Sequence, residues 1–305
     1  MIKNSTSAFA KFSILIAISA FLSTNCFAFE IPTALNFLKP KKSPAKEVRS
    51  LLKQHNKAME SHNIENVKAF YTTDYHSADG FNFDDLAEML EKTYKAYGNI
   101  KYKTKINNIT AFDNWALVQL SDTSSAKLYP DKNKKNKEKM GKLEGKSVYN
   151  VYLKKTKDGW KIVSDEILME ETSLKYGIAN KIDMELITPV FVKNGEEYDV
   201  SLKMEKPEEI VALASISREE IVYPPSDYQE KFRRIPESGD LERLVRANDK
   251  NLDEYAIASI GFTKVSVNEE ELRAKIEVLG MAYIMKRINM EKTKGASLKG
   301  DKVKL

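Results

Sequence analysis

Apolar residues recur every three or four positions after Ser43, which predicts an amphipathic helix at the start of the folded chain. The apolar stripe runs from Val48 to Met59, and Pro44 suits the first helical position. His55 falls on this stripe. We interpret it as a half-buried core residue rather than a metal ligand, because histidine burial is commonly intermediate.

Two further helices are predicted before the pattern changes. Asn63 is a suitable cap for a short helix that carries Tyr71, and the residues from Phe83 to Tyr97 have the spacing of a buried helical face. The segment from Thr72 to Asn82 is polar and is predicted to be a loop. Two titratable residues in this loop are considered below, His76 and Asp79.

From residue 100 the apolar period is two, which predicts strands. Alternating runs extend from Ile100 to Thr110 and from Trp115 to Leu120. Two more run from Glu144 to Leu153 and from Trp160 to Leu168, and the dipeptide Asp158-Gly159 between them predicts a hairpin. Residues 44–177 are therefore expected to form one domain of helices packed on a curved antiparallel sheet.

The order of these elements resembles the nuclear transport factor 2-like superfamily, a cone-shaped fold that includes ketosteroid isomerase and SnoaL-like polyketide cyclases. The resemblance covers residues 44–176 and implies a pocket between the sheet and the helices. Members of the superfamily include enzymes, binding modules and structural domains, so the fold does not determine the function. The matching segments are Val48–Met59, Ala69–Tyr75, Phe83–Tyr97, Trp115–Leu120 and Gly159–Asp165.

The resemblance implies an aspartate base on the sheet, with a tyrosine and an acid as oxyanion donors. The catalytic candidates are then Asp165, Tyr71 and Asp79, with His76 as an alternative in the same loop. Asp165 also fits an outward-facing strand acid, and Tyr71 also fits a core residue. The expected ligand pocket is lined by Tyr71, His76, Trp115, Tyr149 and Asp165. The three histidines lack a metal-ligand spacing, and we expect neither a metal nor another cofactor.

Residues 178–290 have their own alternating pattern and resemble no family that we recognise. Asn194-Gly195 predicts a second hairpin, and short strands with turn signals at regular spacing predict a β-sandwich-like domain. The whole chain is therefore expected to be α+β. The expected strands lie within residues 182–186, 198–204, 210–216, 255–262 and 274–285.

Residues 1–28 have the pattern of a secretory signal. Lys3 and Lys11 precede the apolar run Phe12–Leu22, and small residues favour cleavage after Ala28. Cys26, the single cysteine, leaves acylation at that residue as an alternative that we do not favour. We expect an exported protein, periplasmic or extracellular, with residues 29–43 as a linker.

The formal net charge of +5 is concentrated at the two ends of the chain. Residues 291–305, a predicted disordered tail, carry five lysines against two acidic residues, and two further lysines lie in the predicted signal. The folded body is then close to neutral, which does not favour nucleic acid. A lysine-rich segment, Tyr129–Lys142, and the tail are candidates for weak contact with an anionic surface.

Two functions fit these patterns. We favour a non-enzymatic envelope protein that binds a small molecule or another envelope protein, because no catalytic motif is found in the sequence. The alternative is a small-molecule isomerase or cyclase that uses acid–base residues in the cone pocket.

Overall fold

The computed structural model describes residues 43–128, 140–205, 207–224, 231–236, 238–268 and 273–291 of the 305 residues. The predicted signal with Cys26, residues 29–42 of the linker, residues 129–139 of the lysine-rich segment and residues 292–305 of the tail lie outside this part of the chain. The expectations that fall on them stay predictions. None of the described helices is long and apolar enough to cross a membrane.

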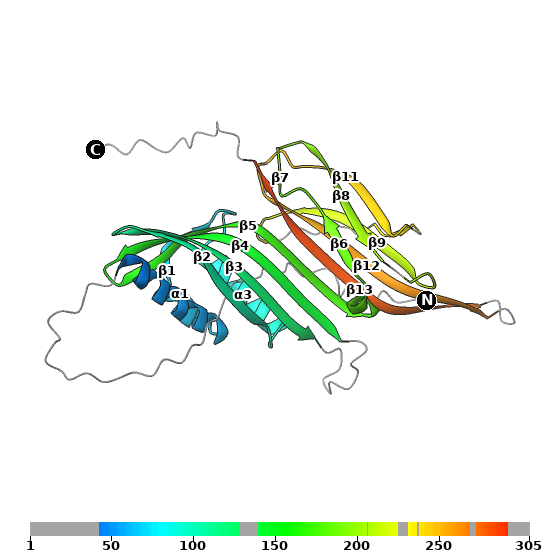
Figure 1. The fold of residues 1–305 in the computed structure, drawn as a ribbon, viewed down its shortest axis with the longest axis horizontal. Coiled ribbons are helices and arrows are strands. Elements are labelled where there is room, and N and C mark those ends of the chain that lie inside the picture. Colours follow the sequence, from blue (N-terminus) through cyan, green and yellow to red (C-terminus); the bar gives the residue numbers. More distant parts are fainter. Residues whose placement is uncertain are drawn as a thin grey trace.

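The described chain is mostly β, with few helices, and a large and predominantly antiparallel sheet runs through it (Figure 1). Each strand along the main path of this sheet is antiparallel to its neighbours. The strands in spatial order are β10 (Arg233–Arg234), β9 (Val211–Glu220), β12 (Glu254–Asn268), β13 (Arg273–Met290), β5 (Gly159–Gly177), β4 (Gly141–Thr156), β3 (Trp115–Leu128) and β2 (Lys101–Ala111).

The hairpin predicted at Asp158-Gly159 is confirmed. Thr156 pairs with Gly159 across the turn, and Gly159 has a φ of 104°, which glycine adopts without strain. Strands β4 and β5 are longer than the apolar alternation predicts, because both continue as partly polar strands beyond the predicted ends.

Three helices lie in the first half: α1 (Pro44–Glu60), α2 (Ile64–Lys68) and α3 (Phe83–Ala96). The Asn82 side chain caps α3 by accepting hydrogen bonds from the backbone N–H groups of Asp84 and Asp85, and the Asn82 N–H donates in turn to Asp85 Oδ2. The helices share a core with the inner face of the sheet, defined here as the face that carries Ala116 and Val118.

The predicted placement of Tyr71 on a helix and of residues 72–82 in a loop is wrong in part. α2 ends at Lys68, and Tyr71 begins strand β1 (Tyr71–Ser77), which runs parallel to β5. Strand β13 pairs with β5 only between Glu171 and Gly177, so the earlier part of β5 has an open edge. β1 covers that edge and satisfies backbone groups there.

The second half adds a small sheet that packs on the large one. Its strands are β6 (Met184–Ile187), β8 (Glu197–Met204) and β11 (Asp240–Arg246), and they share one apolar core with β9, β12 and β13. The hairpin predicted at Asn194-Gly195 is wrong. The strand before it, β7 (Phe191–Val192), pairs in parallel with β13, whereas β8 pairs with β6 and β11.

The large sheet passes through the predicted domain boundary at residues 177 and 178. Gly177 at the end of β5 pairs with Gly280 of β13, and the short 3-10 helix η4 (Ile178–Lys181) follows. The division into domains 44–177 and 178–290 stays a prediction. Within the described residues, backbone hydrogen bonds of one sheet join the two segments.

Candidate functional site

A cavity of about 50 Å³ lies between the helices and the inner face of the sheet. Most of its wall is apolar, with contributions from α1, α3, β3, β4 and β5. It has room for a few water molecules or a small organic group and is well below the size of a drug-sized ligand. The polar residues that line it are His55, Tyr71, Tyr75, Ser77, Asp79, Tyr149, Asp165 and Tyr255.

Asp165 is the polar centre of this cavity. The Tyr75 hydroxyl donates a hydrogen bond to Asp165 Oδ2 over 2.7 Å. The pKa of Asp165 is raised to about 6, mainly by burial and to a lesser extent by the charge of Asp79, while the Tyr75 hydrogen bond and the Arg287 charge oppose the rise. Asp165 therefore gains and loses its proton close to neutral pH, as a general acid or base requires.

Tyr71 faces the cavity from β1 and is held by His55 of α1. The His55 Nε2 and the Tyr71 hydroxyl lie 3.1 Å apart, and the Tyr71 ring packs edge-on against Tyr75 at a centroid distance of 4.8 Å. Burial lowers the pKa of His55 to about 4, so this imidazole is neutral at neutral pH. Burial also raises the pKa of Tyr71, and the nearby Asp165 charge adds to the effect.

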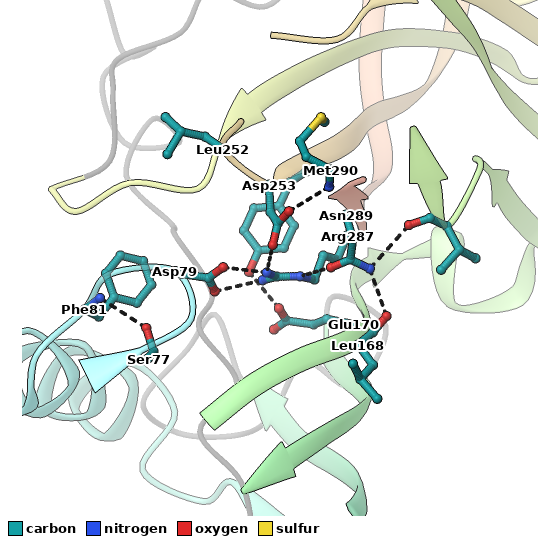
Figure 2. Close-up of polar contacts among 12 residues, drawn as sticks. Ser77, Asp79, Phe81, Leu168, Glu170, Leu252, Asp253, Arg287, Asn289 and Met290 are labelled. Carbon is teal, nitrogen blue, oxygen red and sulfur yellow. Dashed lines mark hydrogen bonds and ion pairs between the residues drawn. The ribbon is translucent and has the colours of Figure 1, made fainter. Parts of the chain in front are cut away.

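Asp79 is bound by an arginine from the second half of the chain (Figure 2). Arg287 of β13 donates Nη1 to Asp79 Oδ2 over 2.9 Å and Nη2 to Asp79 Oδ1 over 2.5 Å. It also pairs with Asp253 over 2.5 Å, and its Nε donates to Asn289 Oδ1 over 2.8 Å. Both oxygens of Asp79 are thus engaged in a bidentate ion pair.

The second half also closes the cavity with an aromatic side chain. Tyr255 of β12 lines the wall, and its hydroxyl donates a 2.6 Å hydrogen bond to the buried Glu170 of β5. Burial and the Glu170 charge raise the pKa of Tyr255 well above its ordinary value, so this hydroxyl stays protonated and keeps donating.

Beside the cavity, Tyr149 of β4 meets a second buried carboxyl group. Its hydroxyl donates to Asp122 Oδ2 of β3 over 3.2 Å. Burial raises the pKa of Asp122 to about 7, and Thr104 and Tyr149 counteract part of this rise by hydrogen bonding. The inner face therefore carries two carboxyl groups, Asp122 and Asp165, that titrate near neutral pH.

Three of the five residues expected in the pocket line this cavity, namely Tyr71, Tyr149 and Asp165, and so does the catalytic candidate Asp79. The other two expected residues, Trp115 and His76, do not line it. Trp115 is 50% exposed, because strand alternation turns it away from the inner face that carries Ala116. His76 is also exposed, and its Nδ1 lies 3.2 Å from the backbone oxygen of Asp74.

Several polar residues of the site were not predicted. Asp122 has a local signal, because it continues the alternation of Val118 and Leu120 and so belongs on the inner face. Arg287 has a weaker local signal, since it lies with Lys286 and Asn289 in a run from Ala282 to Met290 that is mostly apolar. No local pattern assigns Tyr75 to the cavity, because only the pairing of β1 with β5 places it there.

No protein-family model and no curated protein matches this chain. Solved structures that are similar include a candidate dehydratase of the nuclear transport factor 2-like family from Streptomyces avermitilis, at 13% identity over 41% of this chain and 97% of that one, with a TM-score of 0.34. The Kfla4162 protein from Kribbella flavida is 12% identical over 41% of this chain and 88% of that one, with a TM-score of 0.34.

A third similar structure comes from Thiobacillus denitrificans and is described as a candidate association domain of calcium/calmodulin-dependent protein kinase type II. It is 11% identical over 41% of this chain and 93% of its own length, with a TM-score of 0.28. The first of the three is named for the superfamily that the element order of residues 44–176 resembles. These likenesses concern the fold of less than half of the chain.

Proposed function

We propose that this chain is an exported binding protein, in which a cone-like domain holds a small, mainly apolar molecule and a sandwich-like domain closes the site. The observation that supports it is the Asp165–Tyr75 pair, joined over 2.7 Å in a cavity whose wall is mostly apolar. Few convergent polar groups in an apolar cavity are typical of a small-molecule site.

The chemistry of the cavity suggests the kind of ligand. The Tyr75 hydroxyl donates its proton to Asp165 Oδ2, so Asp165 Oδ1 and the Tyr75 oxygen remain as acceptors for a donor group such as a ligand hydroxyl. Tyr71 is engaged by His55 and Asp79 by Arg287, so these residues shape the wall. A cavity of about 50 Å³ favours a compact ligand over an extended chain.

Native mass spectrometry of the chain purified from its own envelope fraction tests this function. We expect the wild type to retain a small molecule. The fraction of protein that carries it should be at least about tenfold lower in the Asp165→Ala variant, because a buried polar partner of the ligand is removed. Asp158→Ala, in the exposed turn between β4 and β5, is the matched control and should retain the ligand.

Two results would contradict the proposal. Purification without any retained small molecule but with a stoichiometric protein partner would favour an adaptor. Recovery of the chain from the cytosol with residues 1–28 intact would overturn the export.

A small-molecule isomerase or cyclase is the second candidate, and the pKa of Asp165 near 6 is the observation that favours it. As a general base Asp165 must be ionised, so turnover of the retained molecule should rise with pH through about 6 and level off above it. Asp165→Asn should then lower turnover by roughly a hundredfold or more. If the protein only binds the molecule, neither the wild type nor the Asp165→Asn variant should convert it.

A further inference from the structure

The outer face of strands β2, β3 and β4, opposite the inner face, carries a row of exposed lysines. Strand alternation turns every second side chain of these strands to solvent, and lysine occupies many of these positions. We define the basic face by six of them: Lys101, Lys103, Lys105, Lys127, Lys146 and Lys154.

Most of these lysines have little local compensation for their charge, although Lys154 interacts with the charge of Asp74. Within the described part of the chain, none of the six has an ion-pair partner. The nearby Glu144 pairs with Lys142 over 2.8 Å, and Glu171 pairs with Lys286 over 3.5 Å. Lys127 lies directly opposite Lys142 in the β3–β4 register, an arrangement that repels.

A hollow of about 940 Å³ lies on this side of the sheet. Lys101, Lys103 and Lys146 line it together with hydroxyl groups of β3, and Glu60, Glu144 and Glu171 are its acidic residues. Since Glu144 and Glu171 are already paired with other lysines, the hollow keeps an excess of unpaired positive charge.

Exposed apolar side chains lie at one end of the same face. Phe112, in the β2–β3 turn, is 68% exposed, and Trp115 and Leu117 of β3 are 50% and 39% exposed. Lys154 of β4 pairs with Trp115 in the register and places its ammonium 5.5 Å from the Trp115 ring centroid. The apolar end and the lysines therefore belong to one continuous surface.

We propose that the basic face docks on the surface of an anionic lipid bilayer. The lysines meet the headgroup phosphates, while Phe112, Trp115 and Leu117 enter the layer below them. A soluble acidic polymer would use the lysines equally well. It would gain little from Leu117, which neither stacks nor forms hydrogen bonds, so the apolar end favours lipid.

Flotation with vesicles tests the proposal, using the chain isolated from its own cells. We expect binding to vesicles of equal parts phosphatidylcholine and phosphatidylglycerol, and less binding as salt is added. The triple variant Lys101→Glu, Lys103→Glu, Lys146→Glu should bind at least about tenfold more weakly. A matched triple variant of exposed lysines elsewhere, Lys53→Glu, Lys181→Glu, Lys193→Glu, should bind as the wild type does.

Tryptophan fluorescence reports insertion directly, because the chain has only two tryptophans and Trp160 is buried. Vesicles should shift the emission of the wild type to shorter wavelength, and Trp115→Phe should abolish this shift. Equal loss of binding in both triple variants, or vesicle binding without a Trp115 shift, would overturn the proposal. So would binding to dextran sulfate with none to vesicles, which would indicate an acidic polymer instead.

Discussion

Asp122 and Asp165 are two carboxyl groups on the inner face of the sheet whose charge is suppressed by burial. The pKa values of about 7 and about 6 have desolvation as their largest cause. Asp165 has a hydrogen-bond donor in Tyr75 and faces the cavity, whereas Asp122 lies beside it, bonded to Tyr149. The raised pKa therefore lies at the cavity in Asp165 and away from it in Asp122, where the buried carboxyl group affects stability.

Asp122→Asn should make the protein less sensitive to alkaline pH. The folded-state pKa of Asp122 lies above its unfolded value, so its stabilising contribution is complete below about pH 4 and is lost as the pH rises through about 7. Relative to wild type, the variant should therefore gain about 2–3 kcal/mol in free energy of unfolding between about pH 5 and about pH 8. Urea unfolding at the two pH values measures it.

Ser124→Ala is the control for this prediction, because Ser124 is buried on the same strand and does not titrate. Its difference from wild type should be equal at both pH values. An Asp122→Asn difference that does not change with pH would show that this carboxyl group is not suppressed by burial.

At the scale of elements, two short strands pair at positions in the sheet that no local sequence pattern predicts. β1 covers the early part of β5, and β7 lies beside the end of β13. Both were predicted differently, as a loop and as the arm of a hairpin. Each of them pairs with a strand that is distant in the sequence. A dipeptide such as Asn194-Gly195 predicts a turn but does not predict which strand the next one pairs with.

Arg287 of β13 links two other parts of the chain. It pairs with Asp79, which follows β1, and with Asp253, which precedes β12. Arg287→Met should lower the free energy of unfolding by about 3–5 kcal/mol, because Asp79 and Asp253 would keep buried or partly buried charges without a partner. Arg287→Lys should recover only part of this loss, since a lysine cannot form the bidentate pair. Chemical denaturation measures all three proteins.

Lys286→Met is the matched control on the same strand. Its partner Glu171 is 40% exposed and the two atoms are 3.5 Å apart, so we expect a loss below about 1 kcal/mol. If Arg287→Lys were as stable as the wild type, the bidentate geometry would not matter.

At the scale of the whole molecule, one sheet connects the two halves of the described chain. The contact between β5 and β13 passes through Gly280, where an added Cβ would lie 2.6 Å from the Tyr176 backbone oxygen and 2.8 Å from the Ile178 nitrogen. The two backbones approach so closely at Gly280 that no side chain fits between them. The first and second halves of the chain are therefore in direct contact at this position.

Gly280→Ala should therefore destabilise both halves together, by about 1–3 kcal/mol, through the strain of overpacking. Hydrogen exchange of β4 amides and of β12 amides should increase in parallel. Gly261→Ala, on the neighbouring β12, has no atom within 4 Å of the added Cβ and should leave both unchanged. Faster exchange confined to β12 and its neighbours would mean that the halves unfold separately.

The sequence alone determined the local elements of this protein. Helical spacing placed α1 and α3, and alternation with Asp158-Gly159 placed the β4–β5 hairpin, because these signals depend on residues a few positions apart. The resemblance of the element order to a cone-shaped fold placed Tyr149 in the wall of an expected pocket. Only the tertiary structure decided that β1 pairs with β5, that β13 continues the sheet, and that Arg287 binds Asp79. These contacts join residues as far as 208 positions apart, and the cavity that Asp165 lines is formed by side chains from both halves.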